Sequence, residues 1–294
     1  MSAIPEYEVL AASPADAASY TIHPLETLDE LRACVRLQEE VWGPGFSQAA
    51  PVSIIKVSQR LGGVVGAAFD ADGEMVAFVF GLTGIERGDV VHWSHMLAVR
   101  PGLRNAGLGR RLKSWQRERC RAVGVRRMYW TFDPLESRNA WLNLGRLGIV
   151  VREYVQDLYG ASDSPLHQGI GTDRFVASWV LDDPRVEERL AGRGVPPPSW
   201  SEVRELPRAF TVTFNGDLPR PGPVETSATV GDALLVPVPA DIQEVKAADP
   251  ELAVAWREAT RGVLLSRLGA GWEVTELVRS PEPVSYYLLR PVAR

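Results

Sequence analysis

The most informative segment of the chain reads Arg104-Asn105-Ala106-Gly107-Leu108-Gly109-Arg110-Arg111-Leu112. Residues 90–99 precede it, rich in β-branched and bulky side chains and free of glycine and proline, which predicts a strand. From Gly109 to about Val123 the apolar residues recur at helical spacing. The order strand, glycine loop, helix leaves unpaired backbone N–H groups at the positive end of a helix dipole, where an anion can bind.

The same segment contains a spaced glycine motif. It reads Arg104-x-x-Gly107-x-Gly109 and follows an Arg-Pro-Gly turn. This motif resembles the acyl-CoA-binding motif of the GNAT (Gcn5-related N-acetyltransferase) superfamily, and the resemblance covers about residues 25–180. Two later stretches, Thr131-Phe132-Asp133-Pro134-Leu135-Glu136-Ser137-Arg138-Asn139-Ala140 and Thr172-Asp173-Arg174-Phe175, resemble an uncharacterised bacterial branch of that superfamily with a long C-terminal extension.

Two other phosphate-binding motifs fit the segment less well. The dinucleotide-binding motif needs a third glycine where this chain has Leu112, and an acidic residue at the end of a later strand. The P-loop needs Gly-Lys-Ser/Thr, which does not follow here. A tight strand-to-helix turn with nothing bound remains the structural alternative.

The neighbouring sequence predicts a mixed sheet. Two strand-like runs, 64–70 and 74–82, flank Ala71-Asp72-Gly73, which is a hairpin signal. The run 127–132 follows the arginine-rich helix, so we expect it to lie parallel to the strand 90–99 through a right-handed crossover. Residues 149–155 and 174–181 are expected to be the last strands of this sheet.

Helical spacing predicts helices over 28–42, 51–61 and 136–147, and Gly148 is expected to end the last of them. The resemblance implies an α/β (α+β) fold in which a mixed central sheet, flanked by helices, contains a splayed pair of parallel strands. A smaller C-terminal α+β subdomain is expected to follow.

The chain is predicted to have four parts. Residues 1–20 form a loose N-terminal arm, 21–191 a GNAT-like acyl-CoA-binding domain, 192–208 a Pro/Gly linker and 209–294 the C-terminal subdomain. In that subdomain Asp249-Pro250 predicts a helix start, and Leu218–Pro223 is expected to be a loop. The expected strands there are 210–214, 234–239, 272–278 and 284–289.

Composition narrows the classes of partner. The net charge of −5 argues against a general nucleic-acid or acidic-membrane binder, although arginines are concentrated between Arg100 and Arg127. The two cysteines, Cys34 and Cys120, lie beside apolar neighbours, have no metal-ligand spacing and are expected to be buried free thiols. No apolar run approaches the ~20 residues that span a bilayer, so we expect a cytoplasmic protein.

The resemblance also implies an acetyl-CoA site. The pantetheine arm would bond to the main chain of the strand before the loop, as a neighbouring strand does. The pyrophosphate would lie on the amides of the loop. The cofactor-binding candidates are Met96, Leu97, Ala98, Val99, Arg104, Asn105, Ala106, Gly107, Leu108, Gly109, Arg110, Ser137 and Asn139.

Acyl transfer to an amine needs a base to remove the amine proton. Members of the superfamily often have a carboxylate early on the first splayed strand, but this strand has only histidines. By alternation, His95 should share a face with Trp93, Leu97 and Val99. It is our candidate base, with Glu136 and Asp133 as alternatives; a capping role is the second interpretation of Asp133.

The leaving thiolate needs a proton donor, and the superfamily often supplies a tyrosine on the helix after the second splayed strand. Aligning on Gly148 places Leu144 at that position, and aligning on Asn139 places Arg146 there. The usual tyrosine is therefore missing. Tyr154 is our candidate replacement, and Tyr159 is a second one.

The sequence predicts three functions, in decreasing order of support. The first is an N-acyltransferase that moves an acetyl group directly from acetyl-CoA to an amine of a small molecule or peptide. The second is a GNAT-like module that binds CoA or another anion without turnover. The third, an arginine-rich nucleic-acid binder, conflicts with the acidic total charge. The C-terminal part could close the acceptor cleft or build a homodimer interface.

Overall fold

The computed structural model describes residues 20–43, 46, 48–103, 107–160, 169–193, 195–224 and 231–292. The chain forms two compact units: the first comprises Met1–Trp130 and Trp179–Asp183, and the second Thr131–Ser178 and Pro184–Arg294. These units divide the chain at other places than the predicted linker 192–208, and the four-part division remains a prediction. The predicted N-terminal arm lies outside the described residues except for Tyr20.

A mixed sheet forms the centre of the first unit. Its strands follow one another in chain order, antiparallel except for the parallel pair β4–β5. They are β1 (Thr21–Pro24), β2 (Val65–Phe69), β3 (Met75–Glu86), β4 (Asp89–Val99) and β5 (Arg127–Phe132), of which β5 enters the second unit after Trp130. The predicted α/β (α+β) class, with a mixed sheet and a parallel pair, is confirmed.

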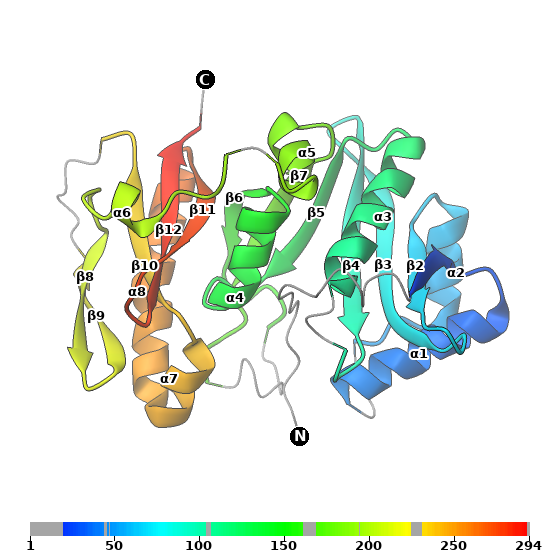
Figure 1. Ribbon diagram of the computed structural model, residues 1–294, viewed down its shortest axis with the longest axis horizontal. Coiled ribbons are helices and arrows are strands. Elements are labelled where there is room, and N and C mark those ends of the chain that lie inside the picture. The colour runs from blue at the N-terminus through cyan, green and yellow to red at the C-terminus, as the bar shows by residue number, and fades with distance from the viewer. Residues whose placement is uncertain are drawn as a thin grey trace. The chain divides into compact units, whose positions relative to one another are not determined.

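Helices cover both faces of this sheet (Figure 1). On one face α1 (Leu28–Trp42) and α2 (Val52–Arg60) enclose a core that includes Phe78 and Phe80. On the other face α3 (Leu108–Ala122) packs against alternate residues of the same strands. Helix α1 begins with a capping box of Thr27 and Glu30.

Both cysteines are buried and free, as predicted. Burial raises the pKa of the Cys34 thiol and that of the Cys120 thiol to about 12, so both remain protonated in the core. Within the described residues, no helix has the length and apolar character needed to cross a membrane.

The second unit has a sheet in the order β7-β6-β11-β12-β10 and a separate hairpin, β8-β9. Its strands are β6 (Val150–Val155), β7 (Arg174–Val180), β8 (Phe210–Asn215), β9 (Leu218–Val224), β10 (Leu234–Pro239), β11 (Trp272–Arg279) and β12 (Val284–Pro291). Its helices are α4 (Ser137–Ala140), the π-helix η2 (Trp141–Arg146), α5 (Pro184–Leu190), α6 (Trp200–Val203), α7 (Ile242–Ala248) and α8 (Pro250–Gly269).

Two predictions for the second unit need correction. The expected loop Leu218–Pro223 is strand β9, because a two-stranded hairpin has only edge strands, where proline need not donate a ladder hydrogen bond. The helix expected over 136–147 changes from α to π at Trp141. The predicted end is correct, since Gly148 has a φ of 72°.

Candidate functional site

Strand β4 is irregular at His95. The register with β3 pairs Met96 with Phe80 and Ser94 with Gly81, so His95 is one residue more than β3 can pair. Such a β-bulge bends a strand and increases its local twist. The bend therefore falls in the middle of β4.

The pairing of β4 with its parallel partner β5 stops close to the bulge. In the described residues, the register between β4 and β5 covers Val91–Trp93 and stops two residues before the bulge. Residues 96–99 are paired with β3 on their other side. Because alternate peptide groups of an antiparallel strand point away from its partner, this segment has backbone donors and acceptors directed to the β5 side. An extended ligand with amide groups can bond there as an added strand does.

The bulge also changes which side chains share a face. The ring of His95 meets that of Phe80 edge-on, with centroids 5.9 Å apart, on the side of the sheet covered by α1. Leu97 and Val99 belong to the core under α3 instead. Our expectation that His95 shares a face with these two residues is wrong, because one extra residue reverses the alternation of the strand.

The loop that follows β4 leads into α3 through Gly107. This residue has a φ of 73°, in the left-handed region, and a Cβ added there would meet nothing within 4 Å. The first N–H groups of a helix have no partner inside the helix. No acidic side chain stands in the first turn of α3. The start of α3 thus suits an anion; Arg104, Asn105 and Ala106 lie outside the described residues.

A buried chain of hydrogen bonds joins β4 to α3. Lys113 Nζ donates to Ser94 Oγ (2.8 Å), Ser94 Oγ donates to Gln116 Oε1 (2.8 Å), and Gln116 Nε2 lies 3.0 Å from His92 Nε2. Burial, with a smaller effect from the Lys113 charge, lowers the pKa of His92 to about 3. His92 is therefore neutral and engaged in the core, where it holds β4 in place.

His95 differs from His92 in exposure. Its side chain is accessible to solvent, yet the protein atoms around the ring lower its pKa below the ordinary histidine value by desolvation. His95 is therefore neutral at pH 7 and can accept a proton. These are the properties of a general base.

The remaining candidates lie in the second unit, and two of them, Ser137 and Asn139, are in α4. Glu136 is half-buried and accepts a hydrogen bond from Gln243 Nε2 (2.6 Å). The buried Ser137 donates its hydroxyl proton to Pro239 O (2.6 Å). Asn139 is also buried, and its Oδ1 accepts from Asn143 Nδ2 (3.1 Å).

The hydroxyl groups of Tyr154 and Tyr159 have different hydrogen-bond partners. Tyr154 is buried and its hydroxyl donates to the Asp173 carboxylate. Burial raises the pKa of this phenol, and the bond to Asp173 raises it further. Tyr159 is 38% exposed, and its hydroxyl lies 2.9 Å from Thr131 Oγ1 at the end of β5. Tyr159 is thus the more accessible donor.

Sequence reasoning missed two arginines of α8. Arg257 and Arg261 bond to Asp133 and Asp173, which stand in the two stretches that resemble the bacterial branch. Those acidic residues were visible in the sequence. Their partners were not, because an arginine within a helix is ordinarily a solvated residue.

Residues 31–145 match the acetyltransferase (GNAT) family. A search of curated proteins gives no match. Among solved structures, the ribosomal-protein-S18-alanine N-acetyltransferase from Escherichia coli shares 18% identity over 56% of this chain and 95% of that chain, with a TM-score of 0.43. The GNAT-family acetyltransferase from Streptococcus pneumoniae shares 16% identity over 55% and 99%, with a TM-score of 0.45. A chain of the NatC complex bound to Gag peptide and CoA shares 12% over 55% and 98%, with a TM-score of 0.45.

Proposed function

We propose that this chain, whose residues 31–145 match the GNAT acetyltransferase family, transfers an acetyl group from acetyl-CoA to an amine of a small molecule or peptide. The observation that carries the proposal is the bulge at His95, where the β4–β5 register ends. The backbone of Met96–Val99 would bond to the pantetheine arm. The amides at the start of α3 would hold the pyrophosphate.

The reaction we propose is a direct transfer. The nitrogen of a neutral amine attacks the thioester carbonyl carbon, and His95 accepts the proton that the amine loses. The carbon–sulfur bond breaks, and the CoA thiolate takes a proton from a tyrosine. The products are the N-acetyl amide and free CoA. We assign the donor to Tyr159, since the proton of Tyr154 is engaged with Asp173.

Binding and turnover are separable in one assay series. Acetyl-CoA at about 100 times its Kd should stabilise the protein by roughly 2.7 kcal/mol, whereas ATP should not. Release of free thiol with a panel of amines then reports transfer. Stabilisation without thiol release would favour the second candidate function, a CoA-binding module. The absence of a tyrosine from the helix 137–146 supports this second function.

Substitution of the two tyrosines should identify the acid. Tyr159→Phe is expected to lower kcat by about 10²-fold or more, the usual contribution of a positioned general acid, and to leave the Kd for acetyl-CoA unchanged. Steady-state kinetics of thiol release measures kcat for Tyr159→Phe and for Tyr154→Phe. If Tyr154→Phe lowers kcat and Tyr159→Phe does not, Tyr154 is the acid.

The pH dependence should report His95. Since its pKa is lowered, its neutral form is present at neutral pH and is lost only as the pH falls through that lowered pKa. We therefore expect kcat/KM to stay level near pH 7 and to decline only below the ordinary histidine pKa of about 6.5. His95→Gln should remove this acidic limb. A limb that persists in His95→Gln would point to another base, such as Glu136.

A further inference from the structure

The segment 133–138, which forms the turn after β5 and the start of α4, is held by side chains and carbonyls from the far end of the chain. The partners lie on β10, α7, α8 and β12, which are all in the second unit. The contacts are Asp133 Oδ2 with Arg257 Nη2 (2.7 Å), Pro134 O with Tyr287 OH (2.6 Å), Glu136 Oε1 with Gln243 Nε2 (2.6 Å), Ser137 Oγ with Pro239 O (2.6 Å) and Arg138 Nη2 with Asp241 Oδ2 (3.1 Å).

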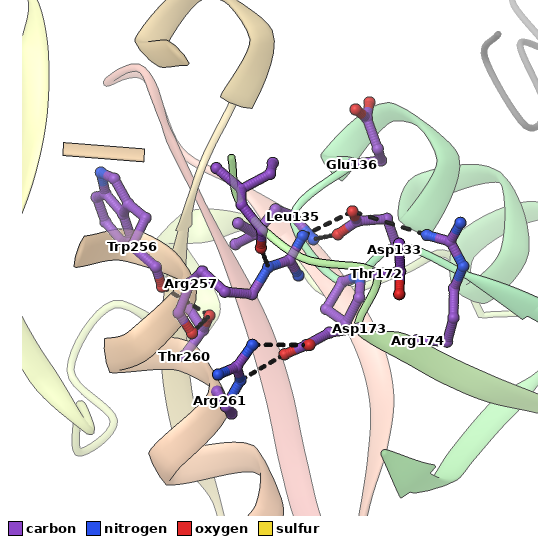
Figure 2. Close-up of polar contacts among 12 residues, drawn as sticks. Asp133, Leu135, Glu136, Thr172, Asp173, Arg174, Trp256, Arg257, Thr260 and Arg261 are labelled. Atoms are coloured by element: carbon purple, nitrogen blue, oxygen red, sulfur yellow. Dashed lines mark hydrogen bonds and ion pairs between the residues drawn. The ribbon is translucent and has the colours of Figure 1, made fainter. Parts of the chain in front are cut away.

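The contact between Asp133 and Arg257 is the most deeply buried of these. Figure 2 shows the guanidinium of Arg257 pointing at the carboxylate of Asp133. Both side chains are 2% exposed, and Arg257 Nε also donates to Ile170 O (3.0 Å). The Asp133 charge raises the pKa of Arg257 against the opposing effect of burial, so the pair is charged.

Asp133 also fixes the backbone of the turn. Its Oδ1 accepts the amide of Leu135 (2.8 Å), so one carboxylate fixes both the guanidinium and a peptide group of the turn. Asp133 is thus the turn residue that the second interpretation of the sequence predicted. The same turn carries Glu136 and leads into Ser137 and Asn139, three of the candidate site residues.

A buried ion pair is a costly way to gain stability alone. Well-packed apolar residues of similar volume often stabilise a protein as much or more. A buried ion pair instead fixes the relative positions of its two side chains, because its hydrogen bonds allow one arrangement of the groups. The charged pair of Asp133 and Arg257 therefore indicates that this contact holds the turn in one position.

We infer that the C-terminal part of the chain, residues 234–291, holds the turn after β5 in its working position, and that Arg257 is a positioning residue for acyl transfer. This inference rests on the proposed function. Arg257 acts through Asp133 and the peptide of Leu135, and it need not touch a substrate.

The test compares Arg257→Met with a matched control in the full chain. Arg185→Met removes an arginine that pairs with the buried Glu276 (3.1 Å) and donates to Thr275 O, both on β11 of the same unit. Arg257→Met is expected to lower kcat by about 100-fold, the effect of a misplacement near 1 Å. The Kd for acetyl-CoA, assigned mainly to β4 and α3, should be retained. Hydrogen exchange of residues 133–138 should become faster.

The control should lose thermal stability while keeping kcat and the exchange of the turn. Arg257→Lys, which keeps the charge, should recover part of kcat and provides a folded variant if Arg257→Met does not fold. Equal kcat in both Met variants, or unchanged exchange of the turn in Arg257→Met, would overturn the inference. If the wild type releases no thiol, the proposed function fails, and the exchange measurement still decides whether Arg257 holds the turn.

Discussion

Gly107→Val is expected to weaken acetyl-CoA binding by about 100-fold, which corresponds to about 3 kcal/mol. Gly107 has a φ of 73°, and an L-residue pays about 1–2 kcal/mol to adopt this conformation, so the turn will relax. Relaxation moves the first amides of α3 away from the pyrophosphate. Hydrogen bonds to a charged group contribute about 1.5–3 kcal/mol each, so losing two of them accounts for the change. Isothermal titration calorimetry measures the Kd.

A second glycine provides the matched control. Gly73, in the β2–β3 turn, has a φ of 80°, and a Cβ added there would also meet nothing within 4 Å. Gly73→Val therefore creates similar backbone strain with a similar loss of stability, but should leave the Kd unchanged. Equal affinity losses in both variants would mean that strain in general, and not the start of α3, weakens binding.

Asp133→Ala is expected to lower the free energy of unfolding by about 3–5 kcal/mol, because it leaves the buried guanidinium of Arg257 without its partner. Urea unfolding followed by circular dichroism measures the change. The double variant Asp133→Ala with Arg257→Met removes the Arg257 charge and should recover part of the loss. The recovery should be incomplete, because the buried Arg174 also pairs with Asp133 (3.8 Å).

A partly exposed ion pair of the same unit provides the comparison. Arg152 pairs with Glu273 at 2.7 Å, and their side chains are 48% and 15% exposed. Arg152→Met should cost no more than about 1 kcal/mol. If Asp133→Ala costs as little, the pair between Asp133 and Arg257 is not the buried, mutually dependent contact described above.

Much of the architecture could be predicted where local signals are strong. The hairpin at Ala71-Asp72-Gly73, the start of α8 at Asp249-Pro250 and the positive φ of Gly148 each follow from the backbone needs of a few residue types. Such signals depend on residues that are adjacent in sequence. They therefore need no knowledge of the tertiary fold.

The site was harder to predict, for two physical reasons. The bulge at His95 has no signature in the sequence, because any residue can occupy a bulge, yet it changes the face of every side chain after it. The pairing of Asp133 with Arg257 joins residues far apart in the chain, and the desolvation of an arginine depends on what packs around it. The π-helix from Trp141 similarly depends on context, since its residues read as an ordinary helix.

Amide hydrogen exchange with and without saturating acetyl-CoA tests the central claim most directly. Slower exchange is predicted in two segments, Met96–Val99 of β4 and Gly107–Arg110 at the start of α3, whose N–H groups would bond to the pantetheine arm and the pyrophosphate. The β2–β3 hairpin should exchange as before. Binding that protects neither segment would contradict the account, since acetyl-CoA would then lie elsewhere on the protein.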